Sequence, residues 1–363
     1  MTDYKTLGIR PVINAFATLT KLGGSVMPPE VLQAMNEAAS CFVDVHELQK
    51  KVGERVAELT HNEAAYISSG AAAGLLLATA ACVIKNEEDK DRFPHLEGLK
   101  DEVIIQKLHR NGYDFAVREV GVKLIEIGTE QGTFADDLKK AITDKTAAIF
   151  WFQGAMNVPT ELSLEEVIAI AKDIPVIVDA AAQLPPASNL RKFTQMGAAL
   201  AVFSGGKDLS GPQSSGLVLG RKDLIEAIRM HGAPNQGVGR PMKVGKEEMM
   251  GLLAAVERYI ELDHEARELV FETRVSHWNE GLSGLEGVTT KRDFPNEAGQ
   301  PVPRTLVMFS EGFTRDSIIQ QLWDGEPCIA VAPAEANGIY LNPMTVNDEE
   351  AEIVLKKLLE VLA

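Results

Sequence analysis

The sequence predicts a protein of two domains, in which a mainly parallel seven-stranded α/β sheet flanked by helices precedes a small C-terminal α+β domain. Short apolar runs rich in Val, Ile and Ala alternate with helical patterns over most of the chain, which is typical of strands that helices cover on both faces. From about Lys246 this alternation gives way to a long helical stretch and then to mixed short elements. The length of 363 residues also exceeds what one compact core usually needs.

The large domain is expected over residues 31–250, after an irregular N-terminal arm over residues 1–30 that mixes Pro, Gly and Thr. A helical pattern fills the stretch from Pro29 to Thr60, and another follows Ser163. Each candidate strand is short and apolar, and helical patterns separate most of them. The seven strands are expected at residues 64–68, 102–106, 122–127, 147–152, 175–179, 199–203 and 216–219.

The small domain is expected over residues 251–363, and the long helical stretch that precedes its strands runs toward Gly281. The remaining elements have the short lengths and mixed order of an α+β domain. They are a strand at residues 304–309, a helix at residues 315–324, short strands within residues 328–341 and a closing helix from Asn347.

Composition and charge limit the classes of function. The formal net charge of −16 disfavours a nucleic-acid partner, because an acidic surface repels phosphate backbones. No apolar run reaches the roughly 18 residues of a membrane span, and the N-terminus lacks the apolar core of a signal peptide. The three cysteines are widely spaced and form no CxxC pair, so neither a disulfide framework nor a metal site is predicted. We therefore expect a cytoplasmic protein without a nucleic-acid partner.

A lysine lies on a glycine-rich bend between the last two strands of the large domain, in Ser204-Gly-Gly-Lys207-Asp208. A phosphate loop of the Walker type is excluded, because Ala201 holds the position of its first glycine and Asp208 follows the lysine. Two interpretations remain. Lys207 is either a solvated turn residue or a partly desolvated amine at a strand end, which can form a Schiff base.

Two further features lie at strand ends of the same sheet. Asp179 ends a buried strand, and in α/β folds that end faces the ligand crevice, although a helix cap or a turn would also explain it. Ser69 and Gly70 follow an earlier strand and open a helix of very small residues, where free backbone N–H groups can bind an anion. For this segment, an ordinary strand–helix turn is the alternative.

Together, the anion-binding turn, the strand-end aspartate and the strand-end lysine resemble the large domain of the fold-type-I enzymes that depend on pyridoxal 5'-phosphate. The sequence is most similar to the branch that contains bacterial selenocysteine synthases and D-glucosaminate-6-phosphate ammonia-lyases, over essentially the whole chain. The segments that carry the likeness are Ser204-Gly-Gly-Lys207-Asp-Leu209-Ser-Gly211-Pro212-Gln213-Ser-Ser-Gly216, Arg10-Pro-Val-Ile-Asn14-Ala, Thr18-Leu-Thr-Lys21-Leu-Gly23-Gly24 and Gly237-Val-Gly-Arg240-Pro-Met-Lys243-Val.

The resemblance implies which residues would contact the cofactor and what each would do. Lys207 would carry the cofactor as a Schiff base and shuttle the substrate's proton, while Asp179 would pair with the pyridine nitrogen. His109, just after a strand, would cover one face of the ring, although a structural histidine is the alternative. The remaining cofactor contacts would be Ser69, Gly70 and Ala71 around the phosphate, with help from Ser204, and Ala181 against the opposite face of the ring.

Two departures from the family pattern bear on function. The selenium-transferring members carry an additional N-terminal region that binds tRNA, whereas this chain begins almost directly with the arm, so we do not expect selenium transfer. Other fold-type-I families place His or Gln shortly after the aspartate. Here three alanines follow Asp179 before Gln183, which leaves the role of Gln183 open.

The favoured activity is that of an ammonia-lyase acting by α,β-elimination on a hydroxylated 2-amino acid, such as the amino sugar acid D-glucosaminate 6-phosphate. Loss of the α-proton and of the β-hydroxyl as water gives an enamine, which hydrolyses to a 2-oxo acid and ammonia. The substrate's anionic groups need cations. The candidates are Arg240 and Lys243 on a Gly/Pro-rich loop and Arg304 at a strand start, with Arg10, Lys21 and Arg110 as weaker ones.

Several alternatives stay open at this point. Racemisation, retro-aldol cleavage and transamination use the same core residues. The non-enzymatic alternatives are a cofactor-binding protein without catalysis and a sugar-phosphate-binding protein that uses Lys207 only as a charge. The resemblance also implies a homodimer or higher homo-oligomer, in which residues 10–25 and 211–215 reach the partner's site.

Overall fold

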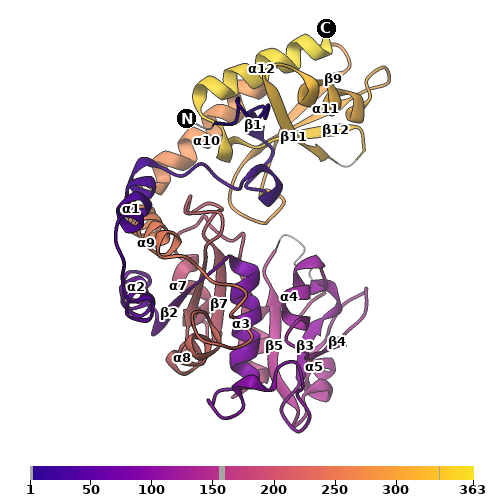
Figure 1. Ribbon diagram of the computed structural model, residues 1–363. Helices are drawn as coiled ribbons and strands as arrows, with labels where there is room; N and C mark the ends of the chain where they lie inside the picture. Colours follow the sequence, from indigo (N-terminus) through magenta and orange to yellow (C-terminus); the bar gives the residue numbers. More distant parts are fainter. Residues whose placement is uncertain (1–2, 155–159, 335) are drawn as a thin grey trace. The chain divides into compact units, whose positions relative to one another are not determined.

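The structure is a computed structural model that describes residues 3–154, 160–334 and 336–363 (Figure 1). The chain divides into two units, of which one is Met27–Leu262 and the other combines Met1–Val26 with Asp263–Ala363. Each unit has its own sheet and its own apolar core. The predicted division at residues 30 and 250 stays a prediction, and the first two residues of the predicted arm lie outside the described part.

The larger unit contains a seven-stranded sheet with the strand order β2-β8-β7-β6-β5-β3-β4. Among these strands β8 alone runs antiparallel to its neighbours. The predicted mainly parallel sheet is therefore confirmed, and each strand begins and ends within one residue of its predicted bounds. The strands are β2 (Ala64–Ser68), β3 (Glu102–Gln106), β4 (Lys123–Ile127), β5 (Thr146–Phe152), β6 (Val176–Asp179), β7 (Leu200–Ser204) and β8 (Gly216–Gly220).

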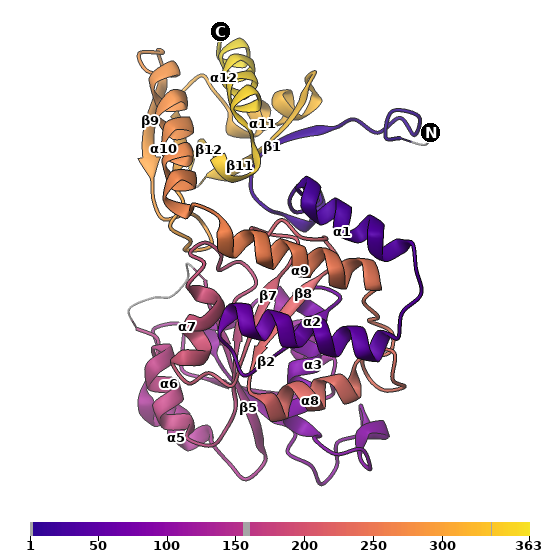
Figure 2. The same cartoon turned by 90° about the vertical axis from the view of Figure 1, so that its left-hand side faces the viewer.

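Helices cover both faces of this sheet because the strands are apolar on both sides. In β2, for example, Ala65 and Ile67 belong to one core, whereas Ala64 and Tyr66 belong to the other. Figure 2 shows α2 and α9, which pack on one another, on the same side of the sheet. One layer is α2 (Val45–Thr60), α5 (Ala135–Ala141), α6 (Leu164–Ala171), α7 (Asn189–Gln195) and α9 (Lys246–Glu261), and the other is α3 (Ala71–Val83), α4 (Phe115–Arg118) and α8 (Lys222–His231).

Two helical patterns that the sequence suggests as continuous are each divided before a capping aspartate. The first becomes α1 (Pro29–Ala39) and α2, because Asp44 accepts the N–H groups of the first turn of α2. The second becomes α9 and α10 (His264–Gly281), because Asp263 caps α10 in the same way. Within the described residues, no helix combines the length and apolarity that crossing a membrane requires.

The smaller unit contains a five-stranded sheet with the order β1-β11-β12-β10-β9. The predicted irregular arm contains one of its strands, β1 (Val12–Ala15), which pairs in parallel with β11. The sequence also missed β9 (Val288–Asp293), because Thr, Lys, Arg and Asp give it no apolar run. The other elements are β10 (Arg304–Phe309), α11 (Arg315–Asp324), β11 (Cys328–Ala334), β12 (Gly338–Leu341) and α12 (Asp348–Leu362), and residue 335 lies outside the described part.

Candidate active site

The predicted cofactor-binding residues lie at or after strand ends at one edge of the large sheet. β2, β7, β6, β5 and β3 run in one direction, so their carboxyl ends meet there, together with the start of β8. Ser68 and Ser204 are both paired with Gly216, and Asp179 is paired with Phe152 on the next strand. This register brings the predicted anion-binding turn, the lysine segment and the aspartate to neighbouring positions.

The phosphate turn, as we name residues 68–71, joins β2 to α3. Gly70 has φ of 94° and forms the N-cap of α3, and no side chain among the described residues caps this helix. A Cβ on Gly70 would meet nothing within 4 Å, so there is open space beside the turn. On its other side, a Cβ on Gly216 would lie 2.7 Å from the backbone nitrogen of Ala71. The turn therefore presents free helix N–H groups to a space that can hold an anion.

The two serine hydroxyls of the phosphate turn are both engaged within the protein. Ser68 Oγ donates to the carbonyl oxygen of Gly70 at 2.8 Å, and Ser69 Oγ donates to that of Met242 at 2.9 Å. The groups of this turn that can still donate to a phosphate are the backbone N–H groups at the start of α3.

The lysine loop, as we name residues 204–216, folds back on itself between β7 and β8. The N–H of Gly205 donates to the carbonyl of Ser215 at 2.9 Å, and the N–H of Gly211 donates to that of Gly205 at 2.8 Å. A Cβ on Gly205 would lie 2.1 Å from Ser215 Oγ, and one on Gly206 would lie 2.6 Å from the Cα of Gln213. The two glycines before Lys207 are thus required by the close approach of the two arms of this loop.

Asp179 is 2% exposed at the end of β6, and its Oδ1 accepts the N–H of Ala181 at 3.1 Å. Burial raises the pKa of this carboxyl to about 6, although the Ala181 N–H and the charge of Lys207 both lower it. Aspartate and lysine are therefore within electrostatic reach of one another, as the spacing of their strands predicts. A buried carboxyl that lacks enough positive charge is suited to a cationic N–H partner such as a protonated pyridine nitrogen.

His109 ends a short 3-10 helix, η3 (Lys107–His109), directly after β3 and is 2% exposed. Its Nδ1 accepts the N–H of Phe152 at 3.3 Å, so the ring proton is on Nε2, which lies 3.0 Å from Glu161 Oε2. Its ring also makes an edge contact with Trp151, at 4.5 Å between centroids. Both ring nitrogens thus have protein partners, the arrangement of a structural histidine, and contact with a cofactor stays a prediction.

Sequence reasoning missed the residues that hold this histidine. Glu161 is 52 positions away in the chain and lies in no motif. The residue after Glu161 is held by Gln106, whose side chain forms hydrogen bonds with both the N–H and the carbonyl of Leu162, at 2.9 and 3.2 Å. The role of Gln183, left open above, includes a hydrogen bond from its Nε2 to the carbonyl of Gln153 at 3.0 Å. None of these hydrogen bonds can be predicted from the sequence, because each joins residues that are far apart in the chain.

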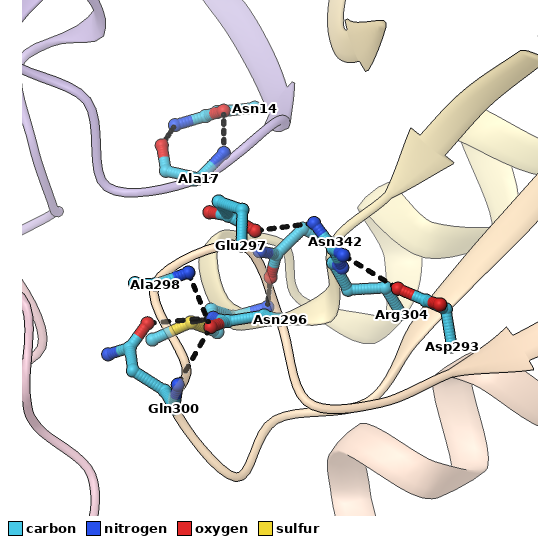
Figure 3. A network of polar contacts seen from close by, with 10 residues as sticks. Asn14, Ala17, Asp293, Asn296, Glu297, Ala298, Gln300, Arg304 and Asn342 are labelled. Carbon is cyan, nitrogen blue, oxygen red and sulfur yellow. Dashed lines mark hydrogen bonds and ion pairs between the residues drawn. The ribbon is translucent and has the colours of Figure 1, made fainter. Parts of the chain in front are cut away.

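The structure places the candidate cations in two kinds of surroundings. Arg240 and Lys243 are exposed, and neither makes an ion pair with any residue that the structure describes. Arg304, in the smaller unit, has 7% of its side chain exposed and pairs with Asp293 and Glu297, each at 2.6 Å (Figure 3). Its terminal nitrogens already have carboxylate partners, so its predicted contact with a substrate carboxylate stays a prediction.

The weaker candidates have structural partners as well. Arg10 donates to the backbone carbonyls at the end of α11, and Lys21 lies 4.9 Å from the centre of the Phe16 ring. Arg110 is paired with Asp114 and Glu126.

Comparisons with known proteins find relatives in both sequence and fold. The family model of L-seryl-tRNA selenium transferase matches residues 12–280. The chain is 32% identical to the D-glucosaminate-6-phosphate ammonia lyase of Salmonella typhimurium (strain 14028s / SGSC 2262), over 99% of this chain and 97% of that one. It is 31% identical to the 5'-C-glycyluridine monooxygenase-decarboxylase of a Streptomyces species, over 99% and 92%. A solved D-glucosaminate-6-phosphate ammonia-lyase superposes with a TM-score of 0.87 at 32% identity, covering 100% and 99% of the two chains. These findings confirm the predicted fold and the predicted resemblance.

Proposed function

The chain belongs to the L-seryl-tRNA selenium transferase family, and from this premise we propose that it is a pyridoxal-phosphate-dependent ammonia-lyase. Its substrate is a hydroxylated 2-amino acid, and D-glucosaminate 6-phosphate is the first candidate, because the lyase of that name is similar over nearly the whole of both chains. The observation that carries the proposal is the sheet edge itself. There a lysine on a tight loop, a buried carboxyl and a free helix start follow neighbouring strands.

The residues at this edge fit the cofactor in charge, and the open space beside Gly70 is available to its phosphate. The N–H groups of Ser69, Gly70 and Ala71 would hold the phosphate at the start of α3, and the Ser204 hydroxyl would assist them. The carboxylate of Asp179 would keep the ring nitrogen protonated, which would relieve its own unfavourable burial, and Ala181 would lie against the ring. Bound pyridoxal phosphate draws electrons away from the α-carbon of the substrate.

Lys207 has two tasks in this proposal. Its amine would hold the cofactor covalently and, when free, would accept the α-proton of the substrate. The protonated lysine then returns that proton to the departing β-hydroxyl, so that water leaves. The released enamine takes up one water to give a 2-oxo acid and ammonia, which balances the water that was lost. Arg240 and Lys243 hold the anionic groups of the substrate.

A second candidate is oxidative decarboxylation at the same α-carbon. It is favoured by the similarity to the 5'-C-glycyluridine monooxygenase-decarboxylase, which is nearly as high as that to the ammonia lyase. The two reactions differ in products that can be measured. The first releases ammonia without consuming oxygen, whereas the second consumes oxygen and releases carbon dioxide.

A product assay on the cofactor-loaded protein tests the proposal. With D-glucosaminate 6-phosphate we expect ammonia and a 2-oxo acid in equal amounts, without an amino acceptor and without carbon dioxide, and we expect Lys207→Ala to abolish both. Oxygen uptake with carbon dioxide release would support the second candidate. Absence of any product from a panel of 2-amino sugar acids and β-hydroxy amino acids of both hands would contradict the lyase assignment.

We also infer how the protein is used in the cell. It works in the cytoplasm, in the catabolism of amino sugar acids, as a homodimer or higher homo-oligomer without a nucleic-acid partner. The acidic net charge of −16 supports the last point.

A further inference from the structure

The hydroxyl of Ser69 joins two segments that are 173 positions apart in the chain. It donates to the carbonyl oxygen of Met242 at 2.9 Å, and a carbonyl can only accept. A phosphate dianion likewise offers only acceptors. A serine whose single hydroxyl proton is given to Met242 therefore has no side-chain proton left for a cofactor phosphate.

The 237–244 loop, which contains Met242, is already anchored at its beginning without Ser69. The N–H of Gly239 donates to the carbonyl of His231 at 3.0 Å, and a Cβ on Gly239 would lie 2.6 Å from Leu77 Cδ2 on α3. The N–H of Met242 donates to the carbonyl of Gly239 at 3.0 Å, and its side chain packs against the core that α3 forms. The Ser69 hydrogen bond then ties the later part of the loop to the phosphate turn, one residue before Lys243.

We propose that Ser69 is a positioning residue, whose hydroxyl holds the 237–244 loop against the phosphate turn and thereby keeps Arg240 and Lys243 aligned for the anionic groups of the substrate. Both cations are exposed and lack ion-pair partners among the described residues, so their position depends on the backbone of the loop. The effect on substrates rests on the proposed function, whereas the contact itself does not. Binding of the cofactor phosphate uses backbone N–H groups and does not depend on this hydroxyl.

Amide hydrogen exchange on the full chain without cofactor tests the contact directly. In Ser69→Ala we expect the amides of Arg240 and Met242, which bond within the loop, to exchange about five- to tenfold faster, the range that one lost hydrogen bond allows. Ser69→Thr keeps a hydroxyl and should restore slow exchange. Ser68→Ala is the matched control, because that hydroxyl bonds Gly70 within the turn and should leave the loop unchanged. Unchanged exchange in Ser69→Ala would overturn the inference.

Kinetics with and without the substrate's phosphate test the consequence. In Ser69→Ala we expect KM for D-glucosaminate 6-phosphate to rise about five- to tenfold and KM for D-glucosaminate, which has only one anionic group, to rise less. The dissociation constant of the cofactor should change less than about twofold. A merely structural role would move the two KM values together. Weaker cofactor binding with an unchanged ratio of KM values would overturn the inference, because the hydroxyl would then act on the cofactor. If the unaltered protein releases no ammonia, the proposed function fails and the exchange measurement decides on Ser69.

Discussion

The carboxyl group of Asp179 is buried at the end of β6. Burial disfavours its negatively charged form unless a cation lies beside it. Its pKa is raised from 3.8 to about 6, mainly by burial. The folded chain without cofactor therefore holds a proton there more tightly than the unfolded chain does. The contribution of this group to stability is fully present below about pH 4 and is lost as the pH rises through about 6.

Replacement of this residue should separate stability from function. In the protein without cofactor, Asp179→Asn should raise the free energy of unfolding above pH 6 by up to about 3 kcal/mol, which corresponds to a pKa difference of about two units, and by almost nothing near pH 4. Urea unfolding at both pH values measures this. The same variant should lose about a hundredfold or more in lyase activity, because the ring nitrogen loses its charged partner. Equal stability of the two proteins at pH 8 would contradict this view of Asp179.

His109 shows which features of a site residue can be predicted from the sequence and which cannot. A histidine after a central strand can be recognised as a candidate, and so can Asp179 and Lys207, because strand ends follow from apolar runs. The partners of His109 cannot be recognised, because one is the backbone N–H of Phe152 and another is Glu161 from a distant loop. Local pattern places a residue at the edge of a sheet, but its hydrogen-bond partners depend on tertiary contacts.

At the level of the secondary-structure elements, the close packing of β8 against β2 and the phosphate turn depends on Gly216. A Cβ on Gly216 would lie 2.4 Å from the carbonyl carbon of Gly70 and 2.7 Å from the nitrogen of Ala71, both of them backbone atoms that must shift. We expect Gly216→Ala to fold but to bind pyridoxal phosphate about ten- to a hundredfold more weakly, since such overpacking costs about 1–3 kcal/mol. Absorbance titration with the cofactor measures the change.

Gly112→Ala is the matched control for this prediction, because a Cβ on Gly112 would meet nothing within 4 Å. That variant should bind the cofactor as the unaltered chain does. If Gly216→Ala also bound it with unchanged affinity, the phosphate turn would not be the cofactor site.

Whether an element could be predicted from the sequence depends on how much of it is buried. Most strands of the large sheet are buried on both faces, so short runs of Val, Ile, Leu and Ala mark them, and even the edge strand β4 keeps three apolar residues beside its exposed Lys123 and Glu126. In β9 five of the six side chains are polar, and β1 has four residues whose partner strand β11 follows over three hundred positions later, so neither strand has a local signal. The breaks before α2 and α10 depend on aspartates whose capping bonds become visible only in the structure.

At the scale of the whole molecule, the larger unit exposes apolar side chains around the connection between α1 and α2. Phe42 is 102% exposed, Leu32 is 50% exposed and Val43 is 45% exposed. Exposed apolar groups of this kind are typical of contacts with another chain. They support the proposed homodimer.

Light scattering coupled to size-exclusion chromatography tests that proposal. We expect twice the chain mass of 39.4 kDa for the unaltered protein, and a shift toward the single-chain mass for Phe42→Glu, because a charge at this position would be buried in the contact. Phe134→Glu changes an equally apolar residue that is 66% exposed at the start of α5, and it should leave the mass unchanged. A monomer at micromolar concentration before any substitution would contradict the proposal.

The proposed function depends above all on Lys207, which is proposed to carry pyridoxal phosphate covalently. The most direct measurement is borohydride reduction of the purified, cofactor-loaded protein, followed by mass spectrometry of its peptides. We expect the yellow absorbance band to disappear on reduction and a phosphopyridoxyl group to be found on Lys207, and we expect Lys207→Ala to show neither the band nor the modified peptide. A protein that takes up no cofactor, or one that carries the group on a different lysine, would contradict it.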